Sequence, residues 1–138
     1  MPNLTIFDDE AALAGAAADH FISKAQEALA ARGRFRAALS GGRGPRGLFQ
    51  VLAQKTGALD WRKVELYWVD ERWVDWKSAD SNYGEAGRLW LDGLKAGPGC
   101  FPMYRGPGDP NEAAELYETL LARRLASKPP VFDLVLLG

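Results

Sequence analysis

The chain has one cysteine and one histidine among its 138 residues. A single thiol excludes an internal disulfide, and without a paired base Cys100 is interpreted as a packed or partly exposed residue rather than a nucleophile. The histidine, His20, falls within the predicted opening helix and has no recognisable carboxylate beside it to orient the ring. We therefore expect it on a helix face and not in a catalytic site.

The chain also lacks an excess of either charge. Seventeen basic residues are balanced by 18 acidic ones, for a formal net charge of -1, so neither nucleic acid nor an anionic lipid surface is expected as a partner. Residues 1–9 have neither the basic start nor the apolar run of a signal peptide, and no segment is long enough to span a membrane. Length and composition predict one α/β domain over residues 1–138, incomplete at its end, in the cytoplasm.

A glycine-rich turn follows the predicted strand Phe35–Leu39, and Pro45 is expected to begin a helix. Glycines let the backbone turn sharply, and the amide groups at a helix N-terminus can bind an anion such as phosphate. Arginines on both sides of the turn add charge-assisted hydrogen bonds. The candidate substrate-binding residues of this turn are Ser40, Gly41, Gly42, Arg43, Gly44 and Arg46.

The turn lacks two better-known signatures. It has no Gly-Lys-Ser/Thr ending, so it is not a P-loop, and it is not the G-x-G-x-x-G dinucleotide fingerprint. Glycine-rich turns between a strand and a helix also occur without any ligand. On these residues alone, a phosphate site and an empty turn both remain open.

A second group of polar residues follows the predicted strand Val64–Val69. Asp70, Glu71 and Arg72 come where this strand ends, and ligands of open α/β sheets bind outside the carboxyl ends of strands. The two strand ends therefore predict one shared pocket. The alternative is a solvated surface loop with ion pairs; the neighbouring residues Trp73, Trp76, Asn82 and Tyr83 favour the pocket.

Four blocks carry a resemblance to a known family. In this order and at these spacings they resemble 6-phosphogluconolactonase, within a superfamily that includes glucosamine-6-phosphate deaminases and isomerases. The resemblance covers nearly the whole chain. The blocks are Ser40–Pro45, Asp70–Trp73, Asp80–Gly84 and Phe132–Gly138.

The resemblance implies hydrolysis of 6-phosphoglucono-δ-lactone to 6-phosphogluconate in the oxidative pentose phosphate pathway, without a metal or organic cofactor. It implies a Rossmann-like, mostly parallel sheet with helices on both faces. The turn after Leu39 would line the sugar-phosphate site and Arg72 would contact the substrate. Asp70 takes the position of the carboxylate that moves a proton in the deaminases. Asn82 is a further substrate-binding candidate, and it and Glu71 are expected to hold the loop in shape.

The chain departs from the family pattern in two places. Arg43 and Gly44 stand where many members have serine and threonine, so hydroxyl donors are missing there. The chain also stops at Gly138, where the family continues with an Asp-Gly-His block that supplies the general-base histidine. The sequence is thus expected to be the N-terminal part of the family's chain, with weak or no activity alone.

Three functional classes remain open. The first is the lactonase, favoured by Arg72 directly after Asp70 and Glu71. The second is an aldose–ketose isomerase or deaminase that uses Asp70 to move a proton. The third is a non-catalytic fragment that binds sugar phosphates, favoured by the missing histidine.

The apolar pattern predicts the remaining elements. The final apolar run is typical of a parallel strand covered on both faces, so an incomplete domain is expected to expose it, to be marginally stable and to self-associate. The predicted strands are Leu4–Phe7, Phe35–Leu39, Val64–Val69, a possible short strand at 101–104, and a last strand at 131–137. The predicted helices run from Asp8 or Asp9 to Gly33, from Pro45 to Lys55, from Ser81 to Leu94 and from Asn111 to Ser127.

Overall fold

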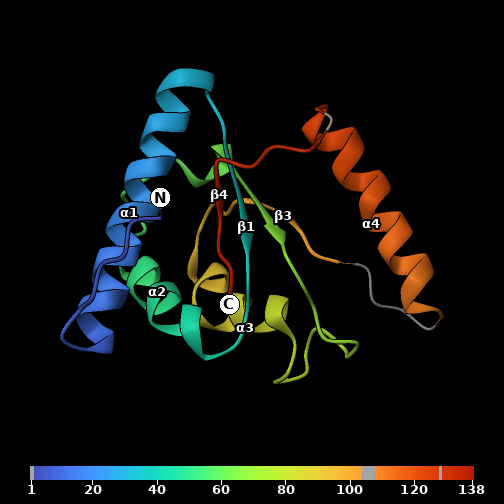
Figure 1. Ribbon diagram of the computed structural model, residues 1–138, viewed down its shortest axis with the longest axis horizontal. Coiled ribbons are helices and arrows are strands. Elements are labelled where there is room, and N and C mark those ends of the chain that lie inside the picture. The colour runs from blue at the N-terminus through green and yellow to red at the C-terminus, as the bar shows by residue number, and fades with distance from the viewer. Residues whose placement is uncertain (1, 104–107, 128) are drawn as a thin grey trace.

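The computed structural model describes residues 2–103, 108–127 and 129–138 and shows a four-stranded sheet. All neighbouring strands pair in parallel, in the order β3-β2-β1-β4 (Figure 1). The strands are β1 (Phe35–Leu39), β2 (Val64–Trp68), β3 (Gly99–Phe101) and β4 (Leu134–Val135). The helices are α1 (Glu10–Arg32), α2 (Arg43–Gln54), α3 (Asn82–Leu89) and α4 (Pro110–Leu125), with 3-10 turns η1 (Trp61–Lys63) and η2 (Leu91–Gly93).

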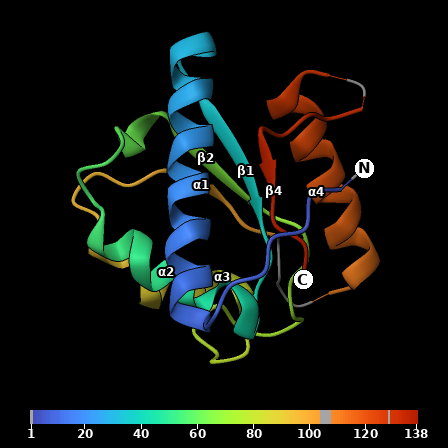
Figure 2. The ribbon, with the colours of Figure 1, turned by 60° about the vertical axis from the view of Figure 1, so that its left-hand side comes forward.

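Helices cover both faces of the sheet, as expected. Side chains alternate between the two faces along a strand, so Phe35, Ala37 and Leu39 of β1 pack on the face that α1 and α2 cover. Ala38 faces the other way and packs with Tyr67 and with Leu125 of α4. Figures 1 and 2 show α1 and α2 on one side of the sheet and α4 on the other.

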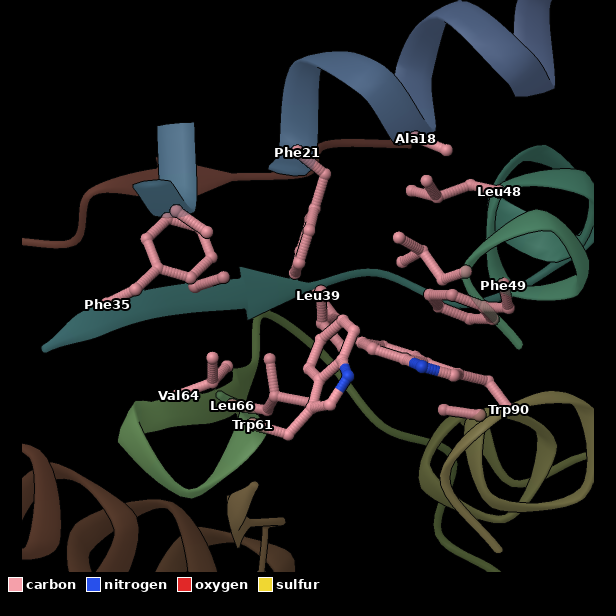
Figure 3. Packing of buried hydrophobic residues seen from close by; sticks show 14 of the residues in the cluster. Ala18, Phe21, Phe35, Leu39, Leu48, Phe49, Trp61, Val64, Leu66 and Trp90 are labelled. Atoms are coloured by element: carbon pink, nitrogen blue, oxygen red, sulfur yellow. The ribbon is translucent and has the colours of Figure 1, made fainter. Parts of the chain in front are cut away.

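A cluster of aromatic rings forms the centre of the larger core (Figure 3). Trp90, directly after α3, stacks on Phe49 of α2 with ring centroids 5.8 Å apart and meets Trp61 and Phe21 edge-on at 5.3 and 5.9 Å. Such ring pairs contribute about 0.5 to 1.5 kcal/mol each beyond their buried area. The cluster therefore fixes α2 and the end of α3 against the same face of the sheet.

Helix α1 begins and ends as the sequence predicts. The Asp9 carboxylate accepts a hydrogen bond from the Ala12 backbone N–H at 2.7 Å, and Gly33 ends the helix at φ 69°. The predicted strand at 4–7, however, is wrong. Leu4 and Ile6 are 88% and 85% exposed, so this short apolar segment neither pairs with the sheet nor packs on it.

Two helices differ from the prediction. Helix α2 begins at Arg43, two residues before Pro45; this is allowed because the first N–H groups of a helix have no partner within it, so the missing N–H of proline costs nothing there. The helix predicted at 81–94 instead breaks at Trp90, whose burial in the aromatic core requires φ −146° and a separate 3-10 turn.

The last part of the chain also differs. Helix α4 ends at Leu125 because Ala126 adopts a left-handed conformation at φ 49°. The short third strand is Gly99–Phe101, and Tyr104 lies outside the described residues. Only Leu134–Val135 of the last apolar run form a strand, while Val131 and Leu137 are 62% and 81% exposed, which agrees with the predicted apolar exposure. No helix in the described ranges is long and apolar enough to cross a membrane.

Candidate functional site

The turn after β1 places backbone amides at its tip. Gly42 occupies the N-cap position of α2 at φ 85°, a conformation that suits glycine, and no side chain caps the helix there. Arg43 and Gly44 of the first helical turn are exposed, whereas Ser40 is buried at the end of β1. The amide groups at this helix N-terminus suit an anion.

Gly41 brings this turn against α3. A Cβ at position 41 would lie 2.0 Å from Oδ1 of Asn82, closer than any real contact, so only glycine fits. Asn82 in turn donates from Nδ2 to the backbone oxygen of Asp70 at 3.2 Å and lies 3.4 Å from its carboxylate. The turn after β1 and the loop after β2 thus both contact Asn82.

Glu71 organises the loop after β2. Its carboxylate accepts hydrogen bonds from the backbone N–H groups of Asn82 and Tyr83, at 2.7 and 3.0 Å, and from the Ser81 hydroxyl at 3.0 Å. It also accepts one from the backbone N–H of Arg72 at 2.7 Å. Carboxylates are favoured at helix N-termini, and this one joins the loop after β2 to the start of α3. Through these hydrogen bonds Glu71 and Asn82 hold the loop in shape, as predicted.

The end of β4 reaches the same edge of the sheet. A Cβ built on Gly138 would lie 3.9 Å from the Ser40 hydroxyl, which places the last residue beside the turn after β1. The structure therefore brings together Ser40, Gly41, Asp70 and Asn82 at the carboxyl ends of three neighbouring strands.

Arg72 lines a hollow that lies apart from the contact between Gly41 and Asn82. Its side chain is exposed and lines a space of about 380 Å³ together with Trp73, Met103 and residues of α4. The turn at 40–44 is not among the residues that line this space. Arg72 is thus adjacent in sequence to the Asp70–Asn82 contact, but the hollow it faces is bounded by α4.

Arg46 is committed to an ion pair with α3. Its Nε donates to Oε1 of Glu85 at 2.5 Å, and the Glu85 carboxylate is largely buried while the Arg46 side chain is half exposed. The pair joins the first turns of α2 and α3, so of the two predicted arginines only Arg43 is free of an ion pair in the described part of the chain.

The remaining reactive side chains lie elsewhere. His20 is exposed on α1. Burial raises the pKa of the Cys100 thiol to about 11, so the thiol is protonated near neutral pH and is a poor nucleophile. Among the described residues, no group of three or more histidine, cysteine, aspartate or glutamate side chains is placed to hold a metal ion.

Sequence reasoning missed Tyr117. Its hydroxyl accepts a hydrogen bond from the backbone N–H of Trp68 at 3.0 Å and donates one to the backbone oxygen of Phe101 at 2.8 Å. Burial raises the pKa of this phenol to about 12. The hydroxyl thereby continues the hydrogen bonding between β2 and β3 and ties α4 to the edge of the sheet. The helical spacing places Tyr117 inward, but nothing in the sequence indicates its partners.

Known proteins are similar to this chain in sequence. The family described as glucosamine-6-phosphate isomerases/6-phosphogluconolactonase matches residues 8–138. A 6-phosphogluconolactonase of Synechocystis sp. is 40% identical over 116 residues, which cover 81% of this chain and 48% of that protein. The corresponding protein of Mycobacterium leprae is 36% identical over 143 residues, covering 99% and 58%. The chain thus spans about half the length of these relatives.

Solved structures share the fold. The crystal structure of a protein named devB superposes with a TM-score of 0.86 at 31% identity, covering 100% of this chain and 58% of that one. A 6-phosphogluconolactonase from Trypanosoma cruzi gives a TM-score of 0.85 at 26% identity, with the same coverage. The match over residues 8–138 shows that this chain belongs to the glucosamine-6-phosphate isomerase/6-phosphogluconolactonase family.

Proposed function

We propose that this chain forms the sugar-phosphate-binding part of a 6-phosphogluconolactonase, a hydrolase of carbohydrate metabolism. The observation that carries the proposal is the contact of the glycine turn with Asn82 and, through it, with Asp70 at the carboxyl edge of the sheet. The similarity to proteins named 6-phosphogluconolactonase supports the same substrate class. The substrate would be a small phosphorylated lactone, and no cofactor is proposed.

In the proposed site, some residues would bind the phosphate and others the sugar. The phosphate would bind at the N-terminus of α2, where the amides after Gly42 and the Ser40 hydroxyl are near and the Arg43 guanidinium adds charge. Arg72 would turn from the hollow beside α4 to the lactone end, where its guanidinium would stabilise the negative charge that develops on the carbonyl oxygen. Asp70 and Asn82, which contact each other, would both hydrogen-bond the sugar from the same side.

Hydrolysis also needs a general base to take a proton from water. The single histidine of the chain, His20, lies exposed on α1 and outside this site. General-base assistance contributes about 10² to 10⁴ in rate, so we propose that the 138-residue chain binds the sugar phosphate but turns the lactone over weakly or not at all. The cytoplasmic location predicted from the sequence suits an enzyme of the oxidative pentose phosphate pathway.

Binding and turnover test the proposal separately. Calorimetric titration of the purified chain with 6-phosphogluconate is expected to saturate, while D-gluconate, which lacks the phosphate, does not bind. Arg43→Gln should weaken binding about tenfold, the loss expected for one charge-assisted hydrogen bond. Lys24→Gln, which removes an equal charge from α1, should leave it unchanged. Phosphate-independent binding would refute the proposed site.

The coupled assay of lactone consumption gives the second readout. The chain alone is expected to be slower than the Mycobacterium leprae relative by the factor given above, and normal turnover would refute the proposed need for a base from elsewhere. A deaminase is the second candidate, because Asp70 lies beside Asn82 where a carboxylate can meet carbon 2 of a bound sugar. Turnover of glucosamine 6-phosphate, but not of the lactone, by the chain fused to the remaining residues of a relative would favour it.

A further inference from the structure

A second polar hollow lies at the opposite, amino edge of the sheet. It measures about 610 Å³ and is bounded by the end of α1, the start of β1, the segment after α4 and the segment before β4. The five residues of β1, about 16 Å of strand, separate it from the turn at 40–44. It is therefore independent of the site proposed above.

Arginines dominate this hollow. Arg32, Arg34 and Arg36 alternate along the chain where α1 gives way to β1, and all three line it. A fourth arginine, Arg124 of α4, does not line the hollow but pairs with Glu65 at 2.9 Å, the same carboxylate that Arg34 and Arg36 contact. Arg32 and Arg34 are more than half exposed, so their guanidinium groups remain accessible to a ligand.

The carboxylates of the cluster are too few to balance these charges. Buried Glu65 meets Arg36 at 3.0 Å and Arg34 at 3.5 Å, besides Arg124. Burial alone would raise the pKa of the Glu65 carboxyl, but hydrogen bonds from Arg36, Tyr67 and Arg124 lower it below its ordinary value, so the group is charged at neutral pH. Asp133 pairs with Arg32 and accepts from the backbone N–H of Arg36.

Four guanidinium groups thus pair with two carboxylates, a surplus of two positive charges in a cluster of which Arg32, Arg34 and Arg36 line the hollow. One guanidinium group is enough to neutralise one buried carboxylate. The charge of Glu65 therefore does not explain why three arginines pair with it. The hollow also holds an unused donor. The Ser127 hydroxyl is shielded from solvent, lines the hollow and has no hydrogen-bond partner within the described residues.

We infer that the amino-edge hollow binds a small polyvalent phosphate, either free pyrophosphate or the diphosphate of a nucleotide. Guanidinium groups match phosphate oxygens with paired hydrogen bonds, and two surplus charges suit a ligand of charge near -2 or -3. Rotation about the Cα–Cβ bond of Ser127 would turn its shielded hydroxyl into the hollow, where it could donate to a phosphate oxygen. The exposed Arg32 and Arg34 guanidinium groups would supply the charge, and Arg36 would stay with Glu65.

Calorimetric titration of the 138-residue chain with pyrophosphate, ADP and AMP tests the inference. Saturable pyrophosphate binding that weakens as salt is raised is expected, because salt screens exposed charges. ADP binding more tightly than pyrophosphate would identify a nucleotide as the source, equal affinities would identify the diphosphate group alone, and AMP should bind more weakly than both.

Variants locate the bound anion. Arg34→Gln should weaken pyrophosphate binding at least tenfold and Ser127→Ala about fivefold, while Lys24→Gln, an equal loss of charge on α1, should leave it unchanged. Arg34 makes only a 3.5 Å contact with Glu65, so its variant should melt as the parent does. If the Arg34→Gln variant melts at a lower temperature, Ser127→Ala tests the same hollow through a different residue.

Arg43→Gln separates the two sites, because it changes the carboxyl edge and should not affect pyrophosphate. Absence of saturable binding, or equal affinity of the Arg34→Gln and Lys24→Gln variants, would overturn the inference. So would a loss of pyrophosphate binding in Arg43→Gln alone. None of these three results would change the outcome expected for the titration with 6-phosphogluconate.

Discussion

Substitution of Gly41 by alanine tests the central contact of the site. The new Cβ would lie 2.0 Å from Oδ1, 2.2 Å from Cγ and 2.7 Å from Cβ of Asn82. No rotation of Asn82 relieves the last of these, because its Cβ is fixed by the backbone. Either the turn or the start of α3 must move.

The expected loss follows from that overlap. Forcing extra atoms into a packed contact costs about 1 to 3 kcal/mol, and the displaced Asn82 would also lose its hydrogen bond to Asp70 at 3.2 Å, worth about 1 kcal/mol. We expect Gly41→Ala to lower the free energy of unfolding by about 2 to 4 kcal/mol in urea titration and to abolish 6-phosphogluconate binding.

Gly44 provides the matched control. A Cβ at Gly44 meets nothing within 4 Å, and alanine is about 1 kcal/mol more favourable than glycine inside a helix, so Gly44→Ala should keep or raise stability. The double variant Gly41→Ala/Asn82→Gly removes all three overlapping atoms and should recover part of the loss, a coupling between the two positions. If Gly41→Ala unfolds at the same urea concentration as the parent, the turn does not lie against Asn82.

Three further outcomes follow from other parts of the molecule. Tyr117→Phe leaves the Trp68 N–H and the Phe101 oxygen without their buried partner, so urea titration should show a loss of about 2 to 3 kcal/mol; an unchanged midpoint would refute the bridge. The pKa of Glu65 is lowered from 4.5 in the folded chain, so its contribution to stability is present above that pH and is lost as the pH falls below it; Glu65→Gln should flatten the acid limb of a stability–pH curve. Leu137 is 81% exposed after β4, which is an edge strand of the sheet in the described part of the chain, so Leu137→Lys should reduce self-association in sedimentation velocity. An equally monomeric parent would contradict this.

The sequence predicts the elements that depend on local pattern. The predictions of β1, β2 and the glycine turn were correct because a short apolar run, a β-prone run bounded by charges and a pair of glycines are signals that act over a few neighbours. The break at Trp90 was missed, since it arises from burial among Phe21, Phe49 and Trp61, which come from three other segments. The short segment at 4–7 has the right composition for a strand but finds no place on the sheet.

The arginines at the amino edge of the sheet show even more clearly that contacts between distant segments cannot be predicted from local pattern. The alternation of Arg32, Arg34 and Arg36 is visible in the sequence, and of the three only Arg36 lies within β1. Their partner Glu65 becomes identifiable only from the register, because Arg36 and Glu65 are paired positions in β1 and β2. Register between strands 29 residues apart depends on the whole packed sheet, and no local pattern encodes it.

The carboxyl-edge site combines a fixed backbone with a free side chain. Three contacts hold α3 in position: the Glu71 carboxylate at its N-terminus, the Arg46–Glu85 pair along its side and Trp90 at its end. Glu71 also binds the backbone N–H of Arg72, so the position from which this arginine extends is set, while its exposed guanidinium has no ion pair with the residues that the structure describes. A sugar phosphate bound at this edge as proposed would therefore recruit Arg72 without rearranging the loop, at a cost in side-chain entropy of about 2 kcal/mol for an arginine.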